Sequence, residues 1–170
     1  MRKAAVLFAA VVLIALLLVS TRHKAGKTAV VAGAASSPSM TDVSGKPISD
    51  SSYAGKVVVI NFWAVWCTPC RTEIPQFIEL QNRQRARGLQ IVGISMDDPA
   101  PVLRKFYNEA KMNYPVAIGD QKLAEAYGGV LGLPTTILIG RDQRVRDKLV
   151  GTTDFKVLEQ KVAALLQEQQ

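Results

Sequence analysis

Apolar positions along residues 57–167 follow two alternating patterns. Short continuous apolar runs rich in β-branched residues predict strands that are buried on both faces, as in a covered sheet. Longer stretches with apolar residues three and four positions apart predict helices with one buried face. The expected strands are Val57 to Phe62, Leu89 to Met96, Tyr114 to Ile118, Thr135 to Ile139 and Arg144 to Val150, and the expected helices are Arg71 to Arg87, Asp98 to Lys111, Gln121 to Tyr127 and Phe155 to Gln167. This order indicates an α/β domain with a mixed central sheet flanked by helices.

Two of these helices have apolar faces that we expect in the core. The buried residues expected on the first helix are Ile74, Phe77, Ile78 and Leu80. Those expected on the second are Val102, Leu103, Phe106 and Tyr107.

A short β-hairpin is expected ahead of the first buried strand. Met40 to Val43 and Ile48 flank the segment Ser44-Gly45-Lys46-Pro47, in which glycine and proline are typical turn residues. With this N-terminal hairpin extension, the predicted domain covers residues 39–170, which is long enough for one hydrophobic core.

The first 24 residues have the pattern of an export segment. Met1-Arg2-Lys3 precedes the run from Ala4 to Val19, which has sixteen residues and no polar side chain. That run can span a bilayer, and no small-residue cleavage site follows it directly, so an uncleaved signal-anchor is favoured over a cleaved signal peptide. Residues 25–38 are rich in Ala, Gly, Ser and Val and are expected to form a flexible tether.

The net charge of +7 belongs mostly to the N-terminal segment. Residues 1–38 carry five basic residues and no acidic one, whereas the remainder carries 16 basic and 14 acidic residues. The folded domain is therefore nearly balanced, and its charge gives no reason to expect nucleic acid as a partner.

The chain has two cysteines, Cys67 and Cys70, in the sequence Trp66-Cys67-Thr68-Pro69-Cys70. The pair follows an expected strand and precedes an expected helix. The first sulfur then lies at the helix N-terminus, where backbone amides and the helix dipole stabilise a thiolate. Two cysteines at this spacing can cycle between dithiol and disulfide, which is the chemistry of a thiol–disulfide oxidoreductase.

Other roles for a C-x-x-C pair fit this sequence less well. A structural zinc site needs four nitrogen or sulfur ligands, but there is no third cysteine and the single histidine, His23, lies in the N-terminal segment. A purely structural disulfide remains an alternative, although so short a loop constrains little of the unfolded chain. No metal and no cofactor are expected in the domain.

The run from Val59 to Arg71 (VINFWAVWCTPCR) resembles the active-site segment of the thioredoxin superfamily, and more narrowly that of the membrane-anchored TlpA/ResA-like thiol:disulfide oxidoreductases. The run from Gly132 to Thr136 (GLPTT) resembles the second signature of that family. The resemblance covers about residues 40–168 and implies a thioredoxin-like fold.

The resemblance also implies roles for individual residues. Cys67 would be the attacking thiolate, and Cys70 would be the resolving thiol that releases the substrate. Pro134 would be cis, beside the sulfurs, and would leave the backbone of Leu133 free to pair with a substrate strand. From the sequence alone, an ordinary trans turn proline after Gly132 is an equal alternative.

Glu73 lies three residues after Cys70, on the adjacent helix face. Thioredoxin has a buried aspartate where this chain has Asn61, and an asparagine cannot accept the proton of the resolving thiol. Members of the resembled group often carry a glutamate at the position of Glu73. We therefore expect Glu73 to be a partly buried acid/base for Cys70 with a raised pKa. The alternative is a solvent-facing glutamate that favours the helix dipole.

Two tryptophans flank the cysteine pair. Trp66 is expected to shield Cys67 and to offer an apolar surface to the substrate, whereas Trp63 is expected to be a packing residue. The predicted substrate-binding residues are therefore Trp66, Leu133 and Pro134.

The sequence predicts an enzyme that reduces protein disulfides on the extracytoplasmic or periplasmic side of the cytoplasmic membrane, held there by a single-pass anchor. The resemblance suggests apocytochrome c as one substrate and a membrane thiol protein as the electron donor. The sequence offers no sign of oligomerisation, so a monomer is expected.

Three other functions share parts of this pattern. A Dsb-type oxidant or isomerase would carry the same motif. A Sco-like copper protein needs a histidine, which the domain lacks, so Met96 and Met112 would have to be its soft ligands. A peroxidase of the peroxiredoxin kind needs a proline and a Thr or Ser before its cysteine, and Ile60 and Ala64 occupy those positions.

Overall fold

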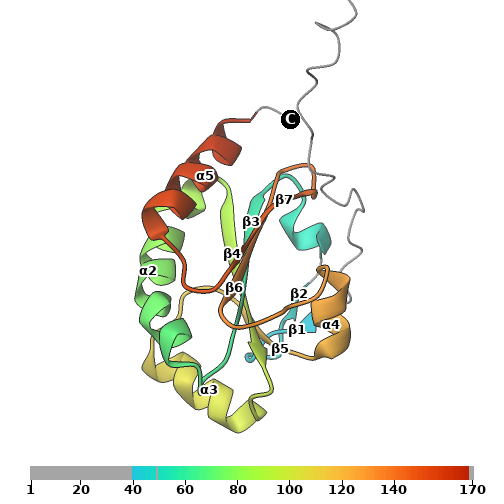
Figure 1. Ribbon diagram of the computed structural model, residues 1–170, viewed down its shortest axis with the longest axis vertical. Coiled ribbons are helices and arrows are strands. Elements are labelled where there is room, and N and C mark those ends of the chain that lie inside the picture. Colours follow the sequence, from blue (N-terminus) through green and yellow to red (C-terminus); the bar gives the residue numbers. More distant parts are fainter. Residues whose placement is uncertain (1–39, 49, 169–170) are drawn as a thin grey trace, which may run out of the picture. The chain divides into compact units, whose positions relative to one another are not determined.

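A computed structural model describes residues 40–48 and 50–168 of the chain (Figure 1). The predicted anchor, residues 1–24, and the predicted tether, residues 25–38, lie outside these described residues. Within the described ranges, no helix has both the length and the apolar character needed to cross a membrane.

Five strands form one mixed sheet, as expected. They are β3 (Val57–Trp63), β4 (Leu89–Met96), β5 (Val116–Gly119), β6 (Thr135–Ile139) and β7 (Val145–Val150). Their order across the sheet is β5-β4-β3-β6-β7. The strands β3, β4 and β5 are parallel to one another. Strand β6 pairs antiparallel with β3, and β7 pairs antiparallel with β6.

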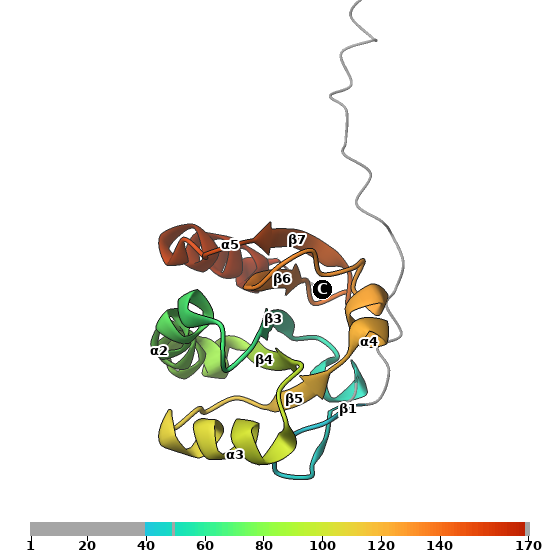
Figure 2. The same ribbon diagram turned by 60° about the horizontal axis from the view of Figure 1, so that its bottom comes forward.

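The helices cover both faces of this sheet. They are α2 (Thr68–Gln84), α3 (Ala100–Glu109), α4 (Gln121–Ala126) and α5 (Phe155–Gln167), with short 3-10 helices η1 (Asp50–Tyr53) and η2 (Arg85–Arg87). Figure 2 shows α2, α3 and α5 on one face of the sheet and α4 with the N-terminal hairpin on the other.

The alternation of side chains along β3 supplies both halves of the core. Val57, Val59 and Trp63 belong to a buried cluster with α2, α3 and α5. Val58 and Ile60 belong to a second buried cluster with α4 and the hairpin. A strand that is apolar on both faces is therefore required at the centre of this sheet, as the sequence predicted.

The N-terminal hairpin is confirmed. Strand β1 (Met40–Thr41) pairs antiparallel with β2 (Pro47–Ile48). In the turn between them, Oδ1 of Asp42 accepts hydrogen bonds from the backbone amides of Ser44 and Lys46. The hairpin also reaches the edge of the main sheet, where the amide of Val43 donates to the carbonyl of Val116 at 2.8 Å.

The expected buried face of α3 is partly wrong. Leu103 is fully buried, but the side chain of Val102 is 46% exposed, and Phe106 and Tyr107 are half-buried. Neighbouring residues on a helix point about 100° apart, so Val102 cannot share the inward direction of Leu103 in a short helix that packs along a narrow stripe.

Helix α2 differs from the expected helix at both ends. It begins at Thr68 rather than Arg71, because Cys67 is its N-cap and the cysteine motif forms its first turn. Its α-helical part ends at Gln84, and η2 continues it to Gly88, which has φ 99°. Ile74, Phe77 and Leu80 are buried as predicted, whereas Ile78 is only half-buried.

Truncation of Phe77 tests the packing between α2 and α5. Its ring is fully buried and meets the ring of Phe155 edge to face, with 4.8 Å between centroids. We expect Phe77→Ala to lower the free energy of unfolding by about 3–5 kcal/mol, because it leaves a cavity. Denaturant unfolding of the oxidised chain measures this. The exposed Val102→Ala is the control, and equal losses in both variants would contradict the assignment of the core.

Candidate active site

The pairing of β3 with β6 brings the two sequence signatures together. In this antiparallel pair, Phe62 lies opposite Thr135. The chain therefore leaves β3 towards Cys67 at the same end of the sheet at which it enters β6 from Pro134. The site is thus built from two loops that are almost 70 residues apart in the sequence.

Cys67 and Cys70 form a disulfide, with 5.3 Å between their Cα atoms. Both residues are buried, Cys67 slightly less than Cys70. Cys67 has an extended backbone and caps α2, where its Sγ accepts a hydrogen bond from the amide of Cys70 at 3.3 Å. In the reduced protein this amide and the helix dipole favour a thiolate on Cys67.

A buried carboxylate, Asp98, holds the loop that leads to Cys67. Its Oδ2 accepts a hydrogen bond from the amide of Val65 at 2.7 Å and a short one from the hydroxyl of Ser95. The sequence pattern indicates Asp98 only as the start of a helix and does not predict this contact. One signal was available, since an acidic residue just after a buried parallel strand lies at the edge where the carboxyl ends of neighbouring strands meet.

Glu73 is buried on α2, so the solvent-facing alternative is wrong. Its carboxylate accepts hydrogen bonds from the backbone amide of Thr153 and, at 3.5 Å, from the Thr153 hydroxyl. Thr153 lies in the loop between β7 and α5. Burial raises the pKa of Glu73 above its usual value, and the two donors of Thr153 oppose part of that rise.

The peptide bond between Leu133 and Pro134 is cis, as the resemblance implied, and the trans alternative is wrong. The carbonyl of Pro134 accepts a hydrogen bond from the amide of Gly151 at 2.9 Å. Among the described residues, the backbone of Leu133 takes part in no hydrogen bond.

The two tryptophans have the different environments that were expected. Trp66 is 65% exposed, whereas Trp63 is fully buried against Phe106, with 5.4 Å between ring centroids. A second exposed apolar side chain, Leu131, lies in the loop before Leu133 and was not singled out from the sequence.

Lys148 of β7 holds the start of that loop. Its ammonium group donates hydrogen bonds to the carbonyls of Tyr127, Gly128 and Gly129, which follow α4. The positive charge therefore provides donors to carbonyl groups that follow the end of a helix.

The described part of the chain contains no group of three or more His, Cys, Asp and Glu residues arranged to hold a metal ion. The two methionines considered as soft ligands are both buried. Met112 belongs to the cluster with the cysteines, whereas Met96 belongs to the cluster on the other face of the sheet. They cannot bind one ion together, and His23 lies outside the described residues.

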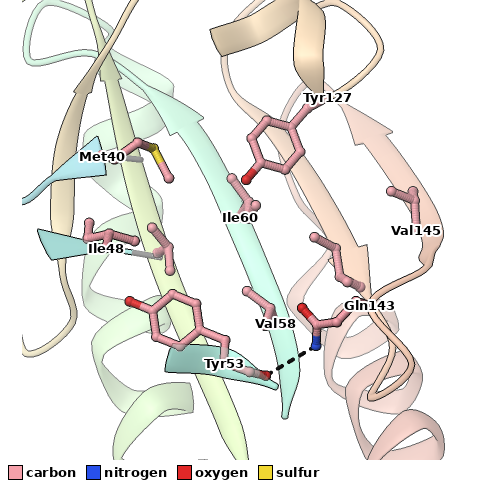
Figure 3. A pocket seen from close by; sticks show the side chains of 10 residues that line it. Met40, Ile48, Tyr53, Val58, Ile60, Tyr127, Gln143 and Val145 are labelled. Carbon is pink, nitrogen blue, oxygen red and sulfur yellow. Dashed lines mark hydrogen bonds between the residues drawn. The ribbon is translucent and has the colours of Figure 1, made fainter. Parts of the chain in front are cut away.

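A small hollow lies on the face of the sheet away from the cysteines (Figure 3). It has a volume of about 20 Å³, and its lining includes Met40, Ile48, Tyr53 and Tyr127. Gln143 contributes to its wall and donates to the carbonyl of Tyr53 at 3.1 Å. Because this hollow opens beside the second core cluster, it does not belong to the redox site.

Replacement of Glu73 should change how stability depends on pH. Above 4.5, the usual pKa of the group, the unfolded chain loses the Glu73 proton while the folded chain, whose pKa is raised, still holds it. The free energy of unfolding therefore falls as the pH rises through this window. Glutamine does not titrate, so we expect Glu73→Gln to gain stability relative to the native chain as the pH rises from about 4 to 8.

Urea unfolding of the oxidised chain at a series of pH values measures this difference. The matched control is Glu79→Gln, which removes an exposed carboxylate from the same helix. A difference between Glu73→Gln and the native chain that stays constant across the pH range would show that burial does not raise the pKa of Glu73.

Comparison with known protein families places these observations in context. The sequence model of the AhpC/TSA family matches residues 31–148. A thiol-disulfide oxidoreductase ResA from Bacillus thuringiensis (strain Al Hakam) is 36% identical over 121 residues, which are 71% of this chain and 69% of that protein. ResA from Geobacillus thermodenitrificans (strain NG80-2) is 31% identical over 141 residues, which are 82% of this chain and 80% of that protein.

Solved structures show the same fold. The crystal structure of a thiol:disulfide interchange protein of the thioredoxin family from Chlorobium tepidum TLS superposes with a TM-score of 0.71 at 32% identity, covering 76% of this chain and 92% of that one. A secreted thiol-disulfide isomerase from Corynebacterium glutamicum gives a TM-score of 0.71 at 25% identity, covering 78% and 84%. These similarities confirm the expected thioredoxin-like fold.

Proposed function

The chain belongs to the AhpC/TSA family and is a thiol–disulfide oxidoreductase related to ResA, and from this premise we propose that it reduces protein disulfides outside the cytoplasm. The observation that carries the proposal is the disulfide at the N-terminus of α2, with a backbone amide directed at Cys67 Sγ and a buried carboxyl group one turn along the helix.

The reaction begins from the reduced pair. The Cys67 thiolate attacks one sulfur of a substrate disulfide, forms a mixed disulfide and releases the first substrate thiolate. Cys70 then loses its proton and attacks Sγ of Cys67, which restores the intramolecular disulfide and releases the second substrate thiolate. Two electrons pass from the enzyme to the substrate, and each substrate thiolate takes up a proton.

Glu73 is proposed to accept the proton of Cys70. A carboxyl group with a raised pKa can take a proton from a thiol and return it to the leaving thiolate near neutral pH. Its position supports this role, because Glu73 follows Cys70 by three residues on α2 and both side chains are buried.

The substrate is proposed to be an extended protein segment. The unpaired backbone of Leu133 offers a donor and an acceptor to such a segment, and exposed Trp66 offers an apolar surface beside Cys67. Pro134 follows Leu133 through a cis peptide bond, and this segment is proposed to pass beside it.

The location and partners complete the proposal. Residues 1–24 would anchor the chain in the cytoplasmic membrane with its domain on the extracytoplasmic side. A membrane thiol protein would then return electrons to the pair, and the resemblance to ResA-like reductases suggests apocytochrome c as a substrate. Protein disulfides persist in that compartment, so a dedicated reductant is needed there.

The residues before Cys67 do not support a peroxidase activity of the peroxiredoxin kind. The residues that peroxiredoxins need before their reactive cysteine are replaced here by Ile60 and Ala64, and both are buried side chains without a hydroxyl group.

The reduction potential of the Cys67–Cys70 pair tests the direction of electron flow. We expect a value near that of thioredoxin, about −270 mV, when the full chain is equilibrated with thiol buffers and its free thiols are counted. A value near about −120 mV would contradict the reductase proposal and would indicate a Dsb-type oxidant instead.

Single cysteine variants test the order of the two thiols. After incubation with insulin, whose disulfides serve as the substrate, we expect reduced Cys70→Ser to accumulate a mixed disulfide, because its resolving thiol is missing. Reduced Cys67→Ser is the matched control and should form no more than traces of adduct. Non-reducing gels and mass spectrometry measure the adduct. Equal trapping by both variants would contradict the assignment of Cys67 as the nucleophile.

A further inference from the structure

Four buried polar side chains form a continuous row from the centre of the sheet to Glu73. Nδ2 of Asn61 donates to Oγ1 of Thr136 at 3.2 Å, and this hydroxyl lies 3.3 Å from Oγ1 of Thr153. The Thr153 hydroxyl in turn lies 3.5 Å from Oε2 of Glu73, and its amide donates to Oε1. All four residues are buried.

Strand alternation explains why these groups meet. Asn61 lies between Val59 and Trp63 in β3, so it points to the face that α2 and α5 cover. Thr136 is its direct partner across the antiparallel pair and precedes Ile137, which faces the other way. Each polar group thus enters an otherwise apolar core, where an unpaired donor or acceptor would be costly.

The hydrogen bonds of this row give every polar group a partner when the donors point in one direction, from Asn61 towards Glu73. The amide nitrogen of Asn61 can only donate, so the oxygen of Thr136 accepts from it and the Thr136 proton is free to turn to Thr153. Thr153 then accepts from Thr136 and sends its own proton to the carboxylate of Glu73. In this direction the row ends in a donor to the ionised form of Glu73.

We propose that Thr153 is a positioning residue for the acid/base step, and that Asn61, through Thr136, sets the direction in which the Thr153 hydroxyl points. This inference rests on the proposed role of Glu73. Thr153 acts only through Glu73: its amide and hydroxyl hold the carboxylate in place and favour its ionised form, which is the form that accepts the Cys70 proton.

The other charged and titratable groups on the elements around Glu73 donate no hydrogen bond to its carboxylate within the described residues, so Thr153 is the group proposed to position it. On its own helix, Cys70 precedes Glu73 by about one turn and is the proposed reaction partner, whereas the side chain of Arg71 is exposed. In the segment before β5, burial raises the pKa of the Tyr114 phenol, and the neighbouring Tyr107 and Glu73 add to this rise. From the β7–α5 loop, Asp154 directs its carboxylate to the amides of Lys156 and Val157 at the start of α5. Within the described ranges, Glu73 forms no ion pair.

Two readouts on the reduced full chain test the proposal. The first is the titration midpoint of the Glu73 carboxyl carbon, followed by NMR and assigned by its absence in Glu73→Gln. The second is the pH profile of the resolving step, measured with a thionitrobenzoate disulfide reagent. Attack by Cys67 releases one coloured thiol, and closure by Cys70 releases the second.

Thr153→Val removes the hydroxyl while it keeps the shape of the side chain and the backbone amide. We expect it to move the Glu73 titration and the profile of the resolving step to higher pH by about one pH unit. Thr153→Ser keeps the hydroxyl and should restore the native behaviour. If Thr153→Val and Thr153→Ser give the same titration as the native chain, the hydroxyl has no positioning role and the inference is wrong.

Asn61→Asp tests the direction of the row without any change at Thr153. A carboxylate can only accept, so the Thr136 proton would turn towards residue 61 and the Thr153 hydroxyl would turn away from Glu73. We expect the titration midpoint of Glu73 to shift in the same direction as in Thr153→Val. In the double variant, the shift should be smaller than the sum of the shifts in the two single variants. Additive shifts would show that Asn61 and Thr153 act separately, which would overturn the proposal.

Glu73→Gln separates this inference from the proposed function. If Glu73→Gln leaves the profile of the resolving step unchanged, the acid/base role of Glu73 is wrong and the positioning role falls with it. If Glu73→Gln changes the profile while Thr153→Val does not, the proposed function stands and only the role of Thr153 is refuted.

Discussion

The antiparallel register of β3 and β6 is the constraint on which the rest of the site depends. It sets Phe62 opposite Thr135 and Asn61 opposite Thr136. The first pair brings the loop to Cys67 and the loop from Pro134 to the same end of the sheet. The second pair points two polar side chains into the helix-covered face beneath α2. A slip of one residue would send both polar groups into the opposite core cluster, so the hydrophobic pattern that fixes the register also fixes the redox site.

Helix α2 combines two opposite electrostatic environments within its first two turns. At its N-terminus, Cys67 receives an amide hydrogen bond and the positive end of the helix dipole, both of which favour an anion. Nearly two turns further along, burial disfavours the charge of Glu73, and the two donors of Thr153 oppose part of this effect. A thiolate and a proton-holding carboxyl group can therefore coexist a few residues apart, because the surroundings of each group, and not its position in the sequence, decide its charge.

The sequence predicted the features that depend on residues close together in the chain, and it did not predict the contacts between residues far apart in the chain. The buried strands, the cysteine pair at a strand–helix junction and the burial of Glu73 follow from local patterns and the family resemblance. The contact between Val65 and Asp98 spans 33 positions, and that between Glu73 and Thr153 spans 80. Asp98 has one local signal, its place just after a buried strand, whereas the local pattern around Thr153 does not differ from that of an ordinary loop. The error at Val102 has another cause, since an adjacent apolar pair does not show which member faces inward.

The loop that carries Thr153 is held by the start of α5. Asp154 caps that helix by accepting hydrogen bonds from the amides of Lys156 and Val157, at 2.9 and 3.2 Å. Phe155, the next residue, packs its ring against Phe77 of α2. The amide of Thr153 is thus fixed relative to α2 on its C-terminal side by a helix cap and an aromatic contact. The same packing that joins α5 to α2 therefore holds the donors of Thr153 at Glu73. Under the proposed acid/base role of Glu73, this packing couples the stability of the core to the protonation chemistry of the cysteine pair.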